Sequence, residues 1–175
     1  MLYGDEFQLS QLRRQLMTAT VNADNLTVAL FYCQNTPGSG EYERRSLEKR
    51  FRGSLRLYPL PCSGRLEASH LVQALEEFAD AAFVITCPKG ECRYFEGNLR
   101  AGKRVQHVQN IIKSIGLKGE RVGFVMNSKE DPKPLAVLTE DIMEAITGLG
   151  HSPALNHEPP VTGTGENEGR PHDYR

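Results

Sequence analysis

The chain has 175 residues, of which 39% are hydrophobic and 25% charged, a composition typical of one globular domain with a core of its own. Its formal net charge of -1 gives no overall field that would hold nucleic acid or an anionic membrane. The apolar runs at 26–32 and 81–87 are too short to cross a bilayer, and the N-terminus lacks a basic segment followed by a hydrophobic stretch. We therefore expect a cytoplasmic protein that neither inserts into a membrane nor binds nucleic acid.

In chain order, the first predicted element is an N-terminal helix at about 6–18, where Leu9, Leu12 and Leu16 recur at helical spacing. From residue 26 onward, short apolar runs of strand length alternate with longer stretches of helical spacing. This alternation is typical of consecutive βα units, whose strands form a parallel sheet. The predicted strands are residues 26–32, 54–59, 82–86 and 121–126.

Three further helices are predicted, each with one apolar face that can cover a sheet. One follows Arg65, one follows Asn98, and one spans about 134–149. Their inward side chains are predicted to be Leu71, Ala74, Leu75 and Phe78, then Val105, Val108, Ile112 and Ile115, and finally Leu138, Ile142 and Ile146. The order of elements predicts an α/β fold: a small flavodoxin-like three-layer domain over residues 26–150 with a four-stranded parallel sheet.

From residue 151 to 175 the composition changes to Pro, Gly, Asn, Glu and His, with almost no large apolar side chains. Such a segment cannot bury enough surface to fold alone, so we expect an extended C-terminal tail. Two roles stay open for it: wrapping a neighbouring subunit, or serving as an unstructured, solubilising terminus.

All four cysteines fall at predicted carboxyl ends of strands. Cys33 follows the first strand, Cys62 lies just past the second, Cys87 ends the third, and Cys92 is in the next loop. Because loops at the carboxyl ends of parallel strands converge and commonly bind ligands, the four thiols are expected to form one site.

Thiolate ligands of a metal group are the favoured interpretation, since nothing indicates secretion and a chain of this length needs no disulfides. The segments 61–65 and 87–92 are rich in Gly and Pro, and they can bring backbone amides close to inorganic sulfide. Three alternatives remain: thiols that only pack in the core, a zinc site, and a thiol-disulfide enzyme using Cys87 and Cys92.

The sequences PCSGR at 61–65 and CPKGECRYFEGNLRA at 87–101 resemble the PCxGR and GCxxGxCHYxxGNxxA motifs of the delta-subunit family of methyl-viologen-reducing hydrogenases. The resemblance extends in order over about residues 26–126. It implies a [2Fe-2S] cluster held by Cys33, Cys62, Cys87 and Cys92, and no catalytic residues.

The resemblance also implies an electron relay that connects an iron-sulfur subunit of a dehydrogenase or hydrogenase with a flavin subunit like that of heterodisulfide reductase. Similar proteins occur in tungsten-dependent benzoyl-CoA reductase complexes and in methylene-tetrahydrofolate reductase assemblies of anaerobes. The motifs do not indicate which of these complexes contains this chain. A zinc-bound or cluster-free adaptor subunit of such a complex is the alternative function.

This sequence departs from the family pattern at two positions. Thr36 stands where relatives tend to have a further cysteine, and Arg93 stands where a histidine is common. Four thiolates still suffice for one cluster. The cations expected near this negatively charged group are Arg65, Arg93, Arg100 and Arg104, although Arg100 and Arg104 could equally form a solvated helix face.

Overall fold

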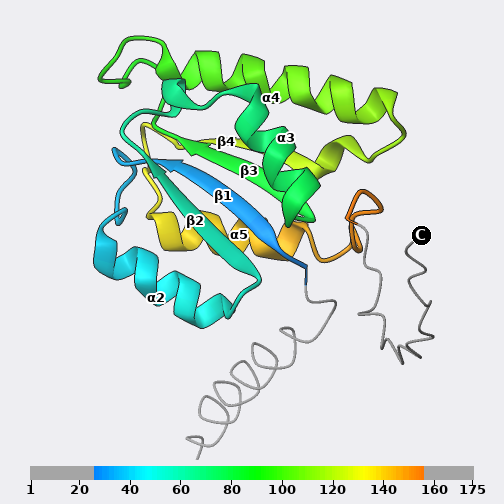
Figure 1. Cartoon of the computed structure of the whole chain (residues 1–175). Coiled ribbons are helices and arrows are strands. Elements are labelled where there is room, and N and C mark those ends of the chain that lie inside the picture. Colours follow the sequence, from blue (N-terminus) through cyan, green and yellow to red (C-terminus); the bar gives the residue numbers. More distant parts are fainter. Residues whose placement is uncertain (1–25, 156–175) are drawn as a thin grey trace, which may run out of the picture.

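The computed structural model describes residues 26–155 and contains a four-stranded, all-parallel β-sheet (Figure 1). The strand order is β2, β1, β3, β4, which matches the start of the flavodoxin-like order. The predicted strand ranges differ from the observed ones by no more than two residues at either end. The strands are β1 (Val28–Cys33), β2 (Leu55–Leu60), β3 (Ala81–Thr86) and β4 (Val122–Met126).

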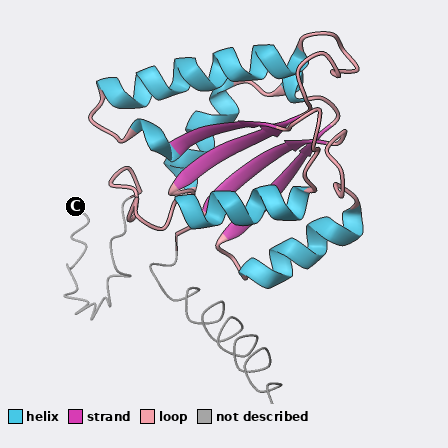
Figure 2. Ribbon diagram, turned by 180° about the vertical axis from the view of Figure 1, so that it is seen from behind, coloured by secondary structure: helices cyan, strands magenta, loops and turns pink. Residues whose placement is uncertain are grey.

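Helices cover both faces of this sheet, as Figure 1 and the opposite view in Figure 2 show. On one face lie α3 (Ala68–Glu77) and α4 (Gly97–Ser114); on the other lie α2 (Glu41–Phe51) and α5 (Leu135–Ala145). The predicted three-layer α/β fold is thus confirmed. The predicted helix at 6–18 and most of the predicted tail, residues 156–175, lie outside the described residues.

Two hydrophobic clusters hold the layers together, one on each face of the sheet. Alternate residues of a strand point to opposite faces, so neighbouring β1 residues contribute to different clusters. The first cluster includes Ala29, Phe31, Leu71, Leu75, Val105, Val108 and Ile112. The second includes Leu30, Tyr32, Leu47, Leu135, Leu138, Ile142 and Ile146.

The prediction that Ile115 faces the core is wrong. Ile115 is 69% exposed, because α4 ends at Ser114 and the chain turns away from the helical register there. Leu117, two residues later, packs against the first cluster in its place. None of the described helices is long and apolar enough to cross a membrane.

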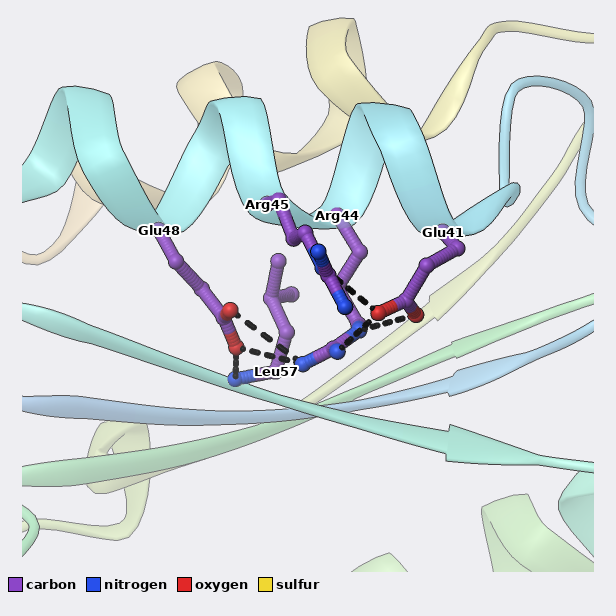
Figure 3. A network of polar contacts seen from close by, with 5 residues as sticks. All are labelled: Glu41, Arg44, Arg45, Glu48 and Leu57. Carbon is purple, nitrogen blue, oxygen red and sulfur yellow. Dashed lines mark hydrogen bonds and ion pairs between the residues drawn. The ribbon is translucent and has the colours of Figure 1, made fainter.

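The outer side of edge strand β2 is covered by side chains of α2 (Figure 3). The Leu57 N–H donates to Glu48 Oε1 at 3.4 Å, and Glu48 is bonded to Arg44, which also pairs with Glu41 at 2.8 Å. Pro59, the next residue of β2 whose backbone nitrogen faces away from β1, has no N–H to donate. These features leave few free donors on the edge, which discourages pairing with another chain.

At the amino ends of the strands, a buried polar cluster fastens the segment that follows α5. The Arg121 guanidinium donates to the carbonyl oxygens of Asp80, Leu149, Gly150 and His151 at 2.8 to 3.3 Å. The carboxylate of Asp80 accepts hydrogen bonds from the Ser152 N–H at 2.6 Å and from a backbone N–H next to β1. Residues 151–155, at the start of the predicted tail, therefore pack against the domain.

Candidate metal centre

The four cysteines line one cavity of about 270 Å³ at the carboxyl edge of the sheet, called the cysteine cavity below. Cys33 is the last residue of β1, Cys62 lies two residues after β2, Cys87 follows β3, and Cys92 is in the loop before α4. All four are free thiols, and Cys92 is the most exposed of them. The predicted convergence of cysteines at the strand ends is confirmed, because parallel strands carry their following loops to the same edge.

The sulfur atoms of Cys62 and Cys92 are close enough to share a metal ion. Cys62 Sγ and Cys92 Sγ are 3.8 Å apart. Two thiolates bound tetrahedrally to one metal at about 2.3 Å would have nearly this separation. Among the described residues, no three Cys, His, Asp or Glu side chains converge on a single ion position. All four sulfurs nevertheless belong to residues that line the same cavity.

Two glycines let the backbone come directly against these sulfurs. A Cβ atom on Gly97 would lie 2.4 Å from Cys62 Sγ and 3.1 Å from Cys92 Sγ, and one on Gly64 would lie 2.8 Å from Gly97 Cα. The Gly64 N–H donates to Cys62 Sγ at 3.4 Å. Gly90, in contrast, has open space around it and a φ of +80°, so it is required for the turn between Cys87 and Cys92.

Two side chains whose roles the sequence did not predict hold the cysteine loops in place. Buried Asn98 donates through Nδ2 to the carbonyl oxygens of Cys87 and Pro88 at 3.1 and 2.7 Å. Its position on the inward face of α4, in register with Ala101 and Val105, is the signal that could have identified it.

Arg104 fastens the loop that carries Cys62 to α4. Its Nη1 donates to the carbonyl oxygens of Gly64 and Leu66 at 2.7 and 2.5 Å, and its Nη2 lies 3.3 Å from Glu67. Arg104 is therefore a brace between two parts of the site and not a solvated cation. The other three predicted cations, Arg65, Arg93 and Arg100, are exposed beside the cavity or the adjoining groove.

The position of Thr36 is also informative. Its backbone N–H donates to the carbonyl oxygen of Cys33 at 2.9 Å, which places it in the turn that follows β1. Its side chain is buried, and its hydroxyl has no hydrogen-bond partner in the described structure. The turn thus keeps a small, buried polar side chain three residues after Cys33.

The thiols differ in how easily they ionise. Burial raises the pKa of Cys87 to about 12, and the neighbouring thiols of Cys33 and Cys92 add to the effect. Burial also raises the pKa of Cys62, partly offset by the Gly64 N–H. For Cys92, burial is outweighed by N–H groups of Tyr94, Asn98 and Gly97, which lower its pKa. Because metals bind thiolates, loading this site must release protons, chiefly from the buried thiols.

Known proteins are similar to this chain over most of the domain that carries the cavity. The family described as methyl-viologen-reducing hydrogenase, delta subunit, matches residues 28–150. The chain is 28% identical over 128 residues to the vhu iron-sulfur subunit of the F420-non-reducing hydrogenase of Methanocaldococcus jannaschii, covering 72% of this chain and 95% of that one. The corresponding iron-sulfur subunit of Methanopyrus kandleri is 32% identical over 116 residues, covering 65% of this chain and 88% of that one.

A different kind of relative is a much longer protein. It is a subunit of the ferredoxin/F420H2-dependent CoB-CoM heterodisulfide reductase of Methanosarcina acetivorans, 34% identical over 101 residues, which is 58% of this chain but only 13% of that protein. A domain of this kind is therefore built into some larger redox proteins. The match over residues 28–150 shows that the chain belongs to the methyl-viologen-reducing hydrogenase delta subunit family.

Proposed function

We propose that this chain is an electron-transfer subunit that binds one [2Fe-2S] cluster through Cys33, Cys62, Cys87 and Cys92. The observation that carries the proposal is the meeting of four free thiols, from three strand ends and one loop, around a single cavity. Four thiolates are the usual protein ligands of such a cluster. When bound, the cluster supplies a centre that accepts and donates single electrons.

The arrangement of the sulfurs favours a group larger than one ion. Cys62 and Cys92, 3.8 Å apart, can bind one iron, while Cys33 and Cys87, at the ends of the adjacent strands β1 and β3, are the candidates for the second. The Gly64 N–H is directed to the sulfur of Cys62 and the Gly97 N–H to the sulfur of Cys92, and both stabilise negative charge there. Asn98 and Arg104 keep the two halves of the ligand set at a fixed spacing.

For partners, we propose a hydrogenase or dehydrogenase iron-sulfur subunit on one side and a heterodisulfide-reductase-like flavin subunit on the other. Support comes from relatives named as hydrogenase iron-sulfur subunits and from the similar segment within the long heterodisulfide reductase protein. When a domain is part of a larger chain in one protein and separate in another, the separate form commonly binds the rest. The chain itself then needs no substrate site.

Replacing each cysteine with serine tests the ligand set. We expect Cys33→Ser, Cys62→Ser, Cys87→Ser and Cys92→Ser each to lower iron affinity by at least about tenfold, because a hydroxyl is a harder and poorer ligand for iron than a thiolate. Iron per chain after anaerobic purification is the measurement. Gln34→Ser, which changes a side chain of the same cavity that is not a thiol, is the control and should keep wild-type iron. Four variants with unchanged iron would disprove the assignment.

The relay function predicts stable partners. A tagged copy of the full chain, purified anaerobically from the organism that produces it, should retain two partners, one with flavin and one with iron-sulfur clusters, identified by mass spectrometry and by their bound cofactors. The expected complex should pass electrons from the iron-sulfur partner to the flavin only when this chain is present. A chain recovered alone that turns over a small-molecule substrate would contradict the relay.

A further inference from the structure

A second, larger hollow adjoins the cysteine cavity. It has a volume of about 810 Å³ and is called the arginine groove here, after Arg65, Arg100 and Arg104 in its lining. Pro61, Cys62 and Tyr94 line both hollows. The Cys62 and Cys92 side of the site therefore lies directly behind the groove, so a redox centre placed there would be separated from the sulfurs by little protein.

The groove has an excess of positive charge. Arg104 is occupied by its bonds to two carbonyl groups and to Glu67, the only acidic residue of the lining. The guanidinium groups of Arg65 and Arg100 are exposed and have no ion-pair or hydrogen-bond partner within residues 26–155. Two uncompensated cations beside a redox site favour an acidic partner and speed its approach.

Tyr94 contributes an aromatic side chain to the groove, and Phe95 follows it in the chain. Tyr94, in the lining of the groove, is 61% exposed, and its neighbour Phe95 is 91% exposed. Phe95 also has a φ of +64°, a left-handed conformation that a bulky residue adopts only at an energetic cost. The side chain of Phe95, exposed as it is, adds nothing to the hydrophobic core. Arginine, tyrosine and phenylalanine are, however, enriched in protein interfaces.

We propose that the arginine groove, with Tyr94 and Phe95 at its rim, is the docking surface for one redox partner, a protein that presents an acidic segment to Arg65 and Arg100 and an apolar pocket to Phe95. The inference rests on the proposed function, because the partner exchanges electrons with the cluster. One electron passes between the partner's centre and the cluster, so one is oxidised as the other is reduced. No bond forms or breaks, and no proton is transferred.

Small oxidants of opposite charge test the field of the groove without any partner. The reduced full chain is mixed in a stopped-flow instrument with anionic hexacyanoferrate(III) or with cationic hexaammineruthenium(III), each of which takes one electron. The double variant R65E/R100E should slow the anionic oxidant by at least about tenfold at low ionic strength and should not slow the cationic one.

The matched control is K49E/K118E. It changes the net charge by the same amount, but Lys49 and Lys118 are exposed at the opposite end of the sheet, before β2 and β4. It should leave both rates within about twofold of the wild type. Equal slowing by the two double variants would mean that only overall charge matters, and it would overturn the proposal.

The purified complex tests docking itself. R65E/R100E and Phe95→Ala should each lose one redox partner on a sizing column while keeping wild-type iron, and K49E/K118E should keep it. Retention of all partners by both groove variants would overturn the docking surface and leave the proposed function standing. Loss in Phe95→Ala alone would also overturn it, because the partner's contact would then be apolar and not acidic. A wild-type chain without a cluster would refute the proposed function instead.

Discussion

Replacing Gly97 with alanine should lower the metal affinity of the cysteine cavity by about 10- to 100-fold, the range seen when groups that support metal ligands are displaced. The new methyl group would lie 2.4 Å from Cys62 Sγ and 3.1 Å from Cys92 Sγ, well inside van der Waals contact. The backbone nitrogen of Gly64 lies 3.2 Å from the same position, so the methyl group cannot move away from the sulfurs in that direction. The Cys62 side chain must therefore shift from its place in the ligand set.

The substitution should disturb the sulfurs without weakening the helix. Gly97 is the first residue of α4 and has no positive φ, and alanine is the better helix former, so the helix itself should tolerate the change. Iron and acid-labile sulfide per chain, measured on anaerobically purified protein, report the effect. Gly148→Ala is the control, because nothing lies within 4 Å of its new Cβ. Wild-type iron in Gly97→Ala would show that the metal does not bind between these sulfurs.

Replacing Arg121 with methionine should lower the free energy of unfolding by about 3–5 kcal/mol, as expected when a buried charge in a hydrogen-bonded cluster is removed. Arg121 is 3% exposed and donates hydrogen bonds to four backbone carbonyl groups. The substitution would remove all of these donors at once. The carboxylate of Asp80, the other buried charged residue between positions 26 and 155, would keep its contact with His151 Nδ1 at 3.3 Å, but the residue would lose the guanidinium that bonds to its carbonyl oxygen. The segment 149–155 should then detach.

Chemical unfolding of the full chain followed by circular dichroism gives the change in stability, and hydrogen exchange at residues 149–155 gives the local detachment. Lys118→Met, an exposed change three residues away, should stay within about 0.5 kcal/mol of the wild type. The cysteine cavity lies at the other end of the strands, so folded Arg121→Met protein should have the iron content of the wild type. If the two variants were equally stable, the role assigned to the Arg121 cluster would be wrong.

The fold was predictable because its central strands, β1 and β3, are buried on both faces and so appear as short, nearly continuous apolar runs. The same topology made the meeting of the cysteines predictable, since each follows a parallel strand or lies in the next loop. Helix α2 could not be delimited from the sequence, because its segment EYERRSLEKRF is mostly charged and buries only Leu47. Its stability depends on ion pairs and on contacts with β2. These interactions do not produce the helical spacing of apolar residues from which a helix is predicted.

The finer parts of the site depend on contacts between residues far apart in the chain. Arg104 reaches Gly64 across 40 positions, and Asn98 reaches Cys87 across 11. The backbone contact between Gly64 and Gly97 is of the same kind. Local patterns report which residues are apolar or turn-forming, but not which carbonyl a side chain will find once the sheet has formed. The bracing of the site could therefore be seen only in the structure.

The central claim, one [2Fe-2S] cluster on four cysteines, is tested most directly by metal and sulfide analysis of the full chain purified without oxygen. We predict a brown protein with about two iron atoms and two acid-labile sulfides per chain, which takes up one electron on reduction and becomes paramagnetic. A colourless protein that carries zinc without sulfide would contradict this account and favour a structural adaptor. Protein that binds neither metal nor sulfide, even after anaerobic reconstitution with both, would show that the four thiols only pack together.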